Sequence, residues 1–172
     1  MISVLIVGKA NYEDSVDMSL IARAFGAANI TFSPANSRIK AKLKKHMAQV
    51  SKKWGGKFEV DFCNNWLELV KNKRNYIKIY LTRYGIPLRK MTYRITTYKN
   101  ILLIATTSES VKSVYTNADF NISISSQPHT CGSSLAVFLH DFYHGRELAM
   151  HFENAESKVV PSDHSVIVKE AQ

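Results

Sequence analysis

Short, strongly apolar segments alternate with amphipathic ones along this chain, and that alternation restricts the folds open to it. Residues 3–7 and 101–105 are apolar almost throughout, which is typical of strands buried on both faces. Between residues 15 and 26, Val16, Leu20, Ile21 and Phe25 recur at helical spacing, and Gly26 ends the helix. Strands that alternate with helices predict an α/β domain with a mostly parallel sheet and helices on both faces.

The same patterns assign most of the remaining chain. We expect further strands at 30–32, 58–62, 76–81 and 120–124, and helices at 111–117 and 133–144. Two more helices should begin at caps on Ser37 and Asn65, and Ser133 or Ser134 is the expected cap of the last helix. Residues 159–160 and 166–168 predict a terminal hairpin. Parallel sheets bind ligands beyond the carboxyl ends of their strands, so the loops after residues 7, 81, 105 and 124 are of functional interest.

The length of 172 residues suits one domain with a small appendage. We expect residues 1–155 to form that domain and residues 156–172 a hairpin or tail. The chain has no run of 18 apolar residues, so we expect no membrane partner. Its apolar start lacks a basic segment and a cleavage site, which argues against a signal peptide. Cys63 and Cys131 are too few for a disulfide framework, and a cytoplasmic location is expected.

The positive charge of the chain is concentrated in its middle. Between Arg38 and Lys99, 17 basic residues stand against 3 acidic ones, a local net of +14, whereas the remainder has a net charge of −5. A basic segment on a mildly acidic frame is the electrostatic pattern of a polyanion binder. A solvated, lysine-rich helix face has the same composition, so charge alone leaves both interpretations open.

Several familiar site motifs are missing or incomplete. No Gly-x-Gly-x-x-Gly follows a strand and no Gly-Lys-Ser/Thr loop occurs, which disfavours an ordinary dinucleotide enzyme and a P-loop NTPase. His140 and His144 have the spacing of a zinc-protease helix, but Asp141 replaces the glutamate of that motif. No third ligand is evident, so we expect no metal.

Two segments combine unusual residues with a position at a strand end. Residues 80–88 leave a strand, turn at Gly85 and are stiffened by Pro87, and residues 125–139 pass from a hydroxyl-rich loop straight into an apolar helix. With several shorter motifs that occur in the same order, these segments resemble the archaeal tRNA 2′-O-methyltransferases that act on cytidine 56, a family of the SPOUT superfamily. The resemblance rests on Ala22-Arg23-Ala24-Phe25-Gly26-Ala27, Trp54-Gly55-Gly56-x-Phe58, Leu81-Thr82-x-Tyr84-Gly85-Ile86-Pro87-Leu88, Ala118-Asp119-Phe120-Asn121, Gln127-Pro128-His129 and Leu135-Ala136-Val137-Phe138-Leu139.

The resemblance implies a SPOUT-type α/β fold with a C-terminal trefoil knot, a homodimer, and S-adenosylmethionine as cofactor. In that family the cofactor lies between three knot loops. Carried over to this chain, the cofactor-binding residues are Leu81, Thr82 and Gly85 in the first loop, Thr106, Thr107, Ser108, Glu109 and Ser110 in the second, and Ile124, Ser125, Ser126, Gln127, Pro128, His129, Thr130, Cys131 and Leu135 in and after the third.

The chain departs from the family pattern inside these loops. Thr106 stands where the family has a glycine, and Ser125-Ser126 replaces Gly-Asn. Thr130-Cys131 replaces Ser-Glu. Outside these loops, near the first strand, Ser15 and Val16-Asp17 stand where the family has Arg and Thr-His before the helix. Since glycine permits a close backbone approach to a ligand, the added side-chain bulk favours an alternative as well. That alternative is a non-catalytic RNA-binding relative; a methyltransferase with another RNA target is a third possibility.

If the chain is the enzyme, the resemblance implies direct methyl transfer to a ribose 2′-hydroxyl of tRNA. Arg23 is the candidate catalytic residue because it interrupts an apolar helix, and an arginine buried without a partner is costly. A salt bridge at a dimer interface would explain Arg23 equally well. The tRNA would be held through its phosphates, with the candidate RNA-binding residues Lys42, Lys45, Lys52, Lys53, Arg83 and Arg89.

Overall fold

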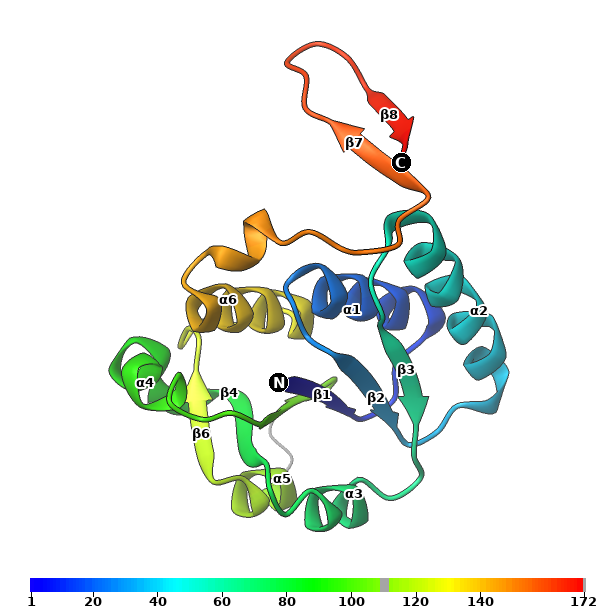
Figure 1. The fold of residues 1–172 in the computed structure, drawn as a ribbon. Helices are drawn as coiled ribbons and strands as arrows, with labels where there is room; N and C mark the ends of the chain where they lie inside the picture. The colour runs from blue at the N-terminus through cyan, green and yellow to red at the C-terminus, as the bar shows by residue number, and fades with distance from the viewer. Residues whose placement is uncertain (109–111, 172) are drawn as a thin grey trace.

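A six-stranded, fully parallel sheet forms the centre of the computed structural model, which describes residues 1–108 and 112–171 (Figure 1). The strand order is β3-β2-β1-β5-β4-β6, and every pair in it is parallel. The expected α/β class is therefore confirmed. The strands are β1 (Ile2–Val7), β2 (Asn29–Ser33), β3 (Glu59–Phe62), β4 (Ile77–Pro87), β5 (Ile101–Thr106) and β6 (Phe120–Ser123).

The helices cover the two faces of the sheet unequally. On one face α1 (Tyr12–Ala24), α2 (Ser37–Trp54), α4 (Leu88–Ile95) and α6 (Cys131–Tyr143) pack over the larger core. On the other face lie only the short helices α3 (Trp66–Asn72) and α5 (Lys112–Asn117) among the described residues (Figure 1). Alternate residues of β1 supply the two cores: Val4 and Ile6 belong to the larger, Leu5 and Val7 to the smaller. Each such buried side chain stabilises the fold by about 1.5–3 kcal/mol.

Strand β4 continues past the end that the sequence predicts. Leu81 and Ile86 both lie opposite Ile122 of β6, so residues 82–85 leave the sheet between them and form a bulge. Gly85 lies in that bulge, and a Cβ there would stand 2.5 Å from the backbone carbonyl carbon and oxygen of Asn121. The bulge can lie against β6 only because residue 85 has no side chain.

The helix caps differ in part from the expected ones. Asn65 caps α3 as predicted, since its Oδ1 accepts from the Glu68 N–H at 3.2 Å. Helix α2 is capped by Asn36 rather than Ser37, through a bond from the Arg38 N–H at 3.1 Å. Thr130, not Ser133 or Ser134, caps α6, because Cys131 and Gly132 already belong to the helix.

Helix α4 was not among the expected elements, although the sequence carries a signal for it. Leu88, Met91 and Ile95 recur at helical spacing and are all buried, while the residues between them are polar or basic. Pro87 is the N-cap residue of the helix, where its missing N–H interrupts no helical hydrogen bond. The helix therefore follows directly from the strand, with no intervening loop.

The predicted terminal hairpin is confirmed: β7 (Ser157–Val160) and β8 (Ile167–Glu170) pair antiparallel. The hairpin projects from the body near the end of α2 (Figure 1). It follows the 3-10 turn η1 (Arg146–Ala149), and its base is held by an ion pair of 3.3 Å between Lys52 and Glu156. The division at residue 155 and the trefoil knot stay predictions.

Candidate functional site

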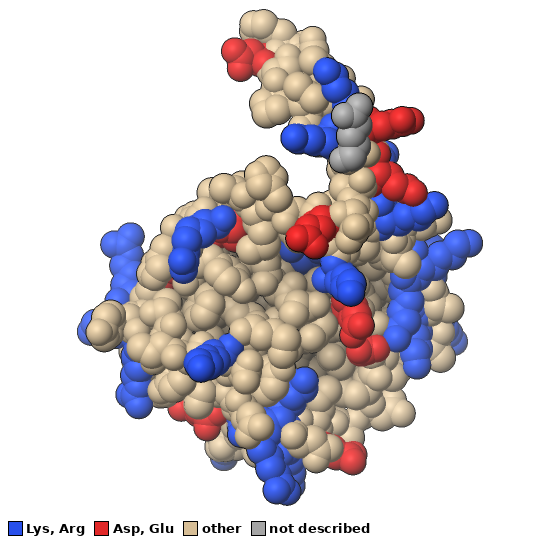
Figure 2. All heavy atoms as spheres, in the orientation of Figure 1, with Lys and Arg blue, Asp and Glu red and all other residues tan. Residues whose placement is uncertain are grey.

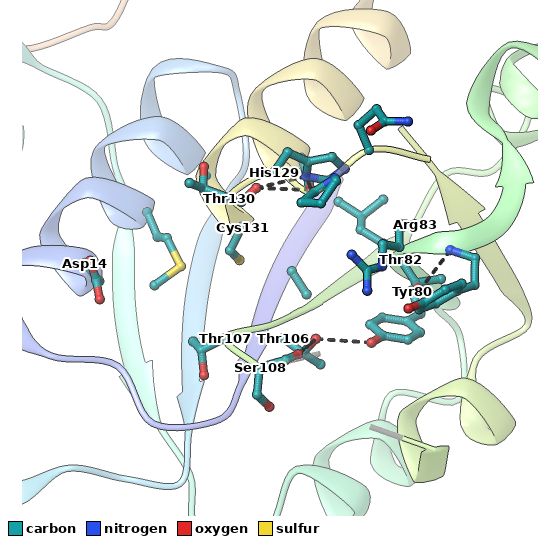
Figure 3. A pocket seen from close by; sticks show the side chains of 18 of the residues that line it. Asp14, Tyr80, Thr82, Arg83, Thr106, Thr107, Ser108, His129, Thr130 and Cys131 are labelled. Atoms are coloured by element: carbon teal, nitrogen blue, oxygen red, sulfur yellow. Dashed lines mark hydrogen bonds between the residues drawn. The ribbon is translucent and has the colours of Figure 1, made fainter. Parts of the chain in front are cut away.

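A pocket of about 460 Å³ opens at the carboxyl ends of β4 and β5, where a parallel sheet is expected to bind its ligand (Figure 3). Four parts of the chain form it: the bulge of β4, the loop after β5, the loop between β6 and α6, and the first half of α1. We call it the loop pocket. It is lined by Asp14, Asp17, Met18, Tyr80, Leu81, Thr82, Arg83, Tyr84, Ala105, Thr106, Thr107, Ser108, Gln127, Pro128, His129, Thr130, Cys131, Gly132 and Ser134.

The loop after β5 is held by the hydroxyl of Thr106. That hydroxyl donates to the Ser108 carbonyl at 2.8 Å, so its oxygen accepts from the Tyr80 hydroxyl at 3.1 Å (Figure 3). The next residue is fixed as well: the Thr107 N–H donates to the Val7 carbonyl at 3.1 Å. Gly8 must be a glycine here, because its φ is +120° and a Cβ would stand 2.2 Å from Thr107 Oγ1.

The loop between β6 and α6 is organised by its own side chains. Ser125 Oγ accepts from the Gln127 N–H at 3.1 Å, and Thr130 Oγ1 accepts from the Ser133 N–H at 3.2 Å. His129 Nδ1 lies 3.0 Å from Ser134 Oγ. Cys131 and Gly132 then begin α6 inside the pocket wall. A Cβ on Gly132 would lie 2.8 Å from Ile21 Cδ1, so this glycine allows α6 to pack closely on α1.

Charges of both signs line the loop pocket. Asp14 and Asp17 lie one turn apart on α1 and share a face of that helix. Arg83 extends from the β4 bulge, with its guanidinium 4.9 Å from the centre of the Tyr84 ring (Figure 3). Burial, with a smaller contribution from Asp14, raises the pKa of the Cys131 thiol to about 12. Cys131 is therefore a neutral thiol at physiological pH and not a nucleophile.

The structure places Arg23 outside the loop pocket, in the last turn of α1. Its Nη2 donates to the Gly55 carbonyl at 2.5 Å, and its guanidinium stacks 4.5 Å from the centre of the Phe152 ring. Only 8% of Arg23 is exposed, and burial lowers the pKa of its guanidinium. Gly55 and Gly56 make room for Phe152: a Cβ on Gly56 would stand 2.5 Å from its ring. Two of the motifs behind the resemblance thus meet at a junction that anchors the segment after η1.

The basic residues of the chain's middle do not form one patch, and a group of basic side chains also lies at the α3 end of the molecule (Figure 2). Those of α2 gather on one side of the molecule and those of α4 on the other (Figure 2). Lys42 stacks on the Tyr12 ring at 3.8 Å, and Lys53 lies 5.1 Å from the Trp54 ring. Lys45 on α2 and Arg89 on α4 are exposed. Arg83 is the RNA-binding candidate that lies at the loop pocket.

The side chains of His140, Asp141 and His144, which have the spacing of a zinc-protease helix, have structural roles. His140 Nδ1 lies 2.6 Å from Oε1 of the buried Glu147, and the Thr92 hydroxyl donates to Asp141 at 2.5 Å. His144 is the left-handed C-cap of α6. Among the described residues, no three His, Cys, Asp or Glu side chains are arranged to hold a metal ion.

Comparison with known proteins connects this geometry to a family. The family of tRNA ribose 2′-O-methyltransferases, aTrm56, matches residues 54–169. A protein from Cenarchaeum symbiosum named tRNA (cytidine(56)-2′-O)-methyltransferase is 35% identical, and the match covers 93% of this chain and 91% of that protein. One of the same name from Methanocaldococcus jannaschii is 33% identical over all of this chain and 98% of its own length. The chain belongs to the aTrm56 family.

Solved structures agree with this family in fold. The SpoU methyltransferase AviRb from Streptomyces viridochromogenes, solved with its cofactor AdoMet, superposes with a TM-score of 0.63 at 12% identity. The match covers 84% of this chain and 57% of that one. The TrmH/SpoU tRNA-modifying enzyme of A. aeolicus gives a TM-score of 0.61 at 18% identity, over 86% of this chain and 76% of that one. In the described part of the aTrm56 chain, no helix is long and apolar enough to cross a membrane.

The loop pocket gathers most of the cofactor residues expected from the family resemblance. Of the fifteen described candidates, ten line it: Leu81, Thr82, Thr106, Thr107, Ser108, Gln127, Pro128, His129, Thr130 and Cys131. The other five shape its surroundings. Gly85 lies against β6, Leu135 is fully buried in the larger core, Ile124 packs against that core, and Ser125 and Ser126 are exposed in the loop. Glu109 and Ser110 lie outside the described residues.

Sequence reasoning missed the contribution of α1 to the loop pocket. Asp14, Asp17 and Met18 precede the first of the three expected cofactor loops by more than sixty residues, and only the fold brings them together. Tyr80 and Ala105 were missed for a different reason. They are residues of buried strands beside the predicted loops, so the alternation pattern marks them as core. Their position at the carboxyl end of a strand was the available signal.

Proposed function

We propose that this protein transfers a methyl group from S-adenosylmethionine to the ribose 2′-hydroxyl of cytidine 56 in tRNA. The observation that carries the proposal is the loop pocket, which three predicted loops build together in a chain of the aTrm56 family. The relatives with high coverage carry the name of this reaction. A tRNA substrate also fits the net charge of +9 and a cytoplasmic location.

The residues of the loop pocket fit the cofactor. When bound, S-adenosylmethionine supplies a methyl group that a sulfonium centre already activates. Asp14 and Asp17 offer carboxylates for the positive sulfonium and ammonium groups, and Arg83 offers a partner for the carboxylate. Thr106 stands where the family has a glycine, but its hydroxyl does not block the site. That hydroxyl is hydrogen-bonded to Ser108 and Tyr80 within the pocket wall.

The chemistry needs positioning and one proton acceptor. The transfer forms a C–O bond as a C–S bond breaks, and the hydroxyl proton leaves to a base. The bulge of β4 and the loop before α6 would hold the ribose in line with the methyl group. Among the described pocket residues, Asp14, Asp17 and His129 carry the carboxylate or imidazole groups that serve as general bases in enzymes. The Cys131 thiol, with its pKa of about 12, is not in this group.

We assign Arg23 a role in the fold rather than in catalysis. Its Nη2 donates to the Gly55 carbonyl and its guanidinium stacks on the Phe152 ring, while Nε has no hydrogen-bond partner among the described residues. Arg23 also lies in the part of α1 away from Asp14 and Asp17. Loss of Arg23 should therefore loosen the segment after η1. This structural role explains why an arginine interrupts the apolar run at residues 20–25.

Two partners complete the proposal. The tRNA phosphates would lie on Lys42, Lys45, Lys52 and Lys53 of α2 and on Arg83 and Arg89, a contact that is sensitive to salt. A second copy of the chain would cover the outer face of α1, α6 and η1. That face exposes Leu20, Val137 and Leu148, with Leu148 72% exposed, and a homodimer would remove them from water.

The second candidate function is RNA binding without catalysis. The observation that favours it is the loss of the loop glycines at positions 106 and 125. This candidate predicts that tRNA binds and S-adenosylmethionine does not. The ordered hydrogen bonds of Thr106 and Ser125 within their loops favour the enzyme over this alternative.

The first experiment is a calorimetric titration with S-adenosylmethionine, with and without a tRNA transcript. We expect saturable binding near one per chain, followed by methylation mapped to the ribose of cytidine 56. A transcript with 2′-deoxycytidine at that position is the matched control and should accept no methyl group. Binding of tRNA with no binding of S-adenosylmethionine in either titration would refute the enzyme and establish the second candidate.

A further inference from the structure

A second pocket lies beside the loop pocket, at the carboxyl ends of β1, β2 and β3. It has a volume of about 320 Å³ and is lined by the chain after β1, the chain after β2 and the start of α2. We call it the α2 pocket. The two pockets share a wall, because Gly8 lines the α2 pocket and packs directly on Thr107 of the loop pocket.

The α2 pocket is positively charged. Lys9 and Arg38 line it, and none of the described residues in its wall has a carboxylate side chain. Neither cation has an ion-pair partner in the described part of the chain. The first turn of α2 contains no acidic residue, so its helix dipole adds to the positive potential. This arrangement attracts an anion.

Part of the lining of the α2 pocket is apolar. Phe62, Pro34 and Ile39 belong to it, and the Phe62 ring stacks on Phe32 with 5.6 Å between ring centres. A pocket that combines an aromatic ring and apolar side chains with two cations suits a ligand that has a flat, weakly polar part and a phosphate. A nucleotide has both parts, whereas inorganic phosphate uses only the cations.

We propose that the α2 pocket binds one nucleotide of the tRNA substrate, with its phosphate between Lys9 and Arg38. This inference rests on the proposed function, since it takes tRNA as the substrate. The shared wall at Gly8 and Thr107 places the bound nucleotide next to the cofactor. The α2 pocket therefore sets where the RNA backbone runs as it approaches the loop pocket.

The test measures tRNA affinity as a function of salt for Arg38→Ala and Lys9→Ala. Each variant should raise the Kd for tRNA about tenfold and lower the slope of log K against log salt by about 1. Lys40→Ala is the matched control, because Lys40 is an exposed cation two residues from Arg38 on the same helix but does not line the α2 pocket. Its Kd should stay within about twofold of the wild-type value, as expected for a screened surface charge.

Two outcomes would overturn the inference. One is that Arg38→Ala and Lys9→Ala keep the wild-type affinity and salt slope, and the other is that Lys40→Ala loses as much as they do. The binding assay contains no S-adenosylmethionine, so its result does not depend on methyl transfer. A wild-type protein that binds tRNA but fails to methylate it would refute the proposed function, and the affinities of the variants would still test the α2 pocket. Titration of each variant with S-adenosylmethionine should give the wild-type affinity, because neither residue lines the loop pocket.

Discussion

At the scale of single residues, the surroundings of a few side chains fix their hydrogen-bonding role, the position of their charge or their protonation. Thr106 uses its one hydrogen on Ser108 and so presents only a lone pair to Tyr80. Arg23 is buried against a carbonyl and a ring, which keeps its charge away from the loop pocket. Cys131 lies at the start of α6 with its proton retained. Each state follows from the immediate surroundings rather than from the residue type.

The retained proton of Cys131 gives a pH prediction. The thiol pKa is raised from 9.0 to about 12, so at pH 8 the native protein holds about a thousandfold less thiolate than the unfolded chain. Alkylation of Cys131 by iodoacetamide should therefore be slow at pH 8 and should keep rising with pH beyond 9, where the unfolded thiol levels off. Mass spectrometry of the Cys131 peptide separates it from Cys63.

The negative charge of Asp14 contributes to the raised pKa of Cys131, and a variant of Asp14 tests this contribution. Asp14→Asn removes a nearby negative charge, lowers the thiol pKa and should speed the alkylation of Cys131. Asp163→Asn in the exposed hairpin loop should leave the rate unchanged. If native Cys131 reacts at pH 8 as fast as the unfolded chain does, the buried and protonated thiol is refuted.

At the scale of elements, the bulge of β4 links the sheet to the loop pocket. The Cβ of Gly85→Ala would stand 2.5 Å from the backbone of β6, and backbone atoms cannot rotate aside as the end of a flexible side chain can. We expect a loss of about 2–3 kcal/mol in the free energy of unfolding. Affinity for S-adenosylmethionine should fall as well, because Thr82 and Arg83 move with the bulge.

Gly145→Ala separates steric clash from backbone strain. Gly145 has a φ of +77°, but a Cβ there would lie 3.6 Å from its nearest neighbour, an ordinary contact. This variant should lose only about 1 kcal/mol of stability, the cost of the left-handed conformation, with the cofactor affinity unchanged. Chemical denaturation and calorimetry measure the two effects. Equal losses in both variants would contradict the role given to Gly85.

Elements were predictable from sequence where burial alone decides them. The apolar runs of β1 and β5 were predicted because full burial leaves a continuous pattern. The exposed hairpin was predicted from its two valine-containing segments around a turn at residues 161–163. Helix caps were less certain, since Asn36 and Ser37 are both good caps and only the backbone path chooses between them. The end of β4 was missed because pairing resumes at Ile86 after four residues outside the sheet.

At the scale of the whole molecule, the site could be predicted only loop by loop. The three loops were named from the resemblance, and ten of their described residues do line one pocket. The contribution of α1 and the position of Arg23 were not predictable. They depend on contacts with Gly132, Gly55 and Phe152, which are between 32 and about 130 residues away in sequence. Long-range packing of this kind leaves no local pattern.

The proposed homodimer gives a prediction at this scale. Light scattering should give twice the chain mass of 19.5 kDa for the wild type. Val137→Glu puts a charge on the outer face of α6, where Val137 is 46% exposed, and should shift the protein to monomer. Tyr93→Glu on α4, where the side chain is 90% exposed, is the control and should stay dimeric. A wild-type monomer would contradict the proposed interface.

The unequal cover of the sheet has a dynamic consequence. Helices α3 and α5 are short, and the core beneath them is the smaller of the two, so this side should open at the lowest free energy and exchange its amide hydrogens first. Helix α5 is also tied to the pocket: the Tyr115 hydroxyl donates to the Tyr84 carbonyl at 3.3 Å, and its ring meets Tyr80 edge-on. Each local opening of α5 therefore releases one rim of the loop pocket, which gives ligands a way in and out while the larger core stays folded.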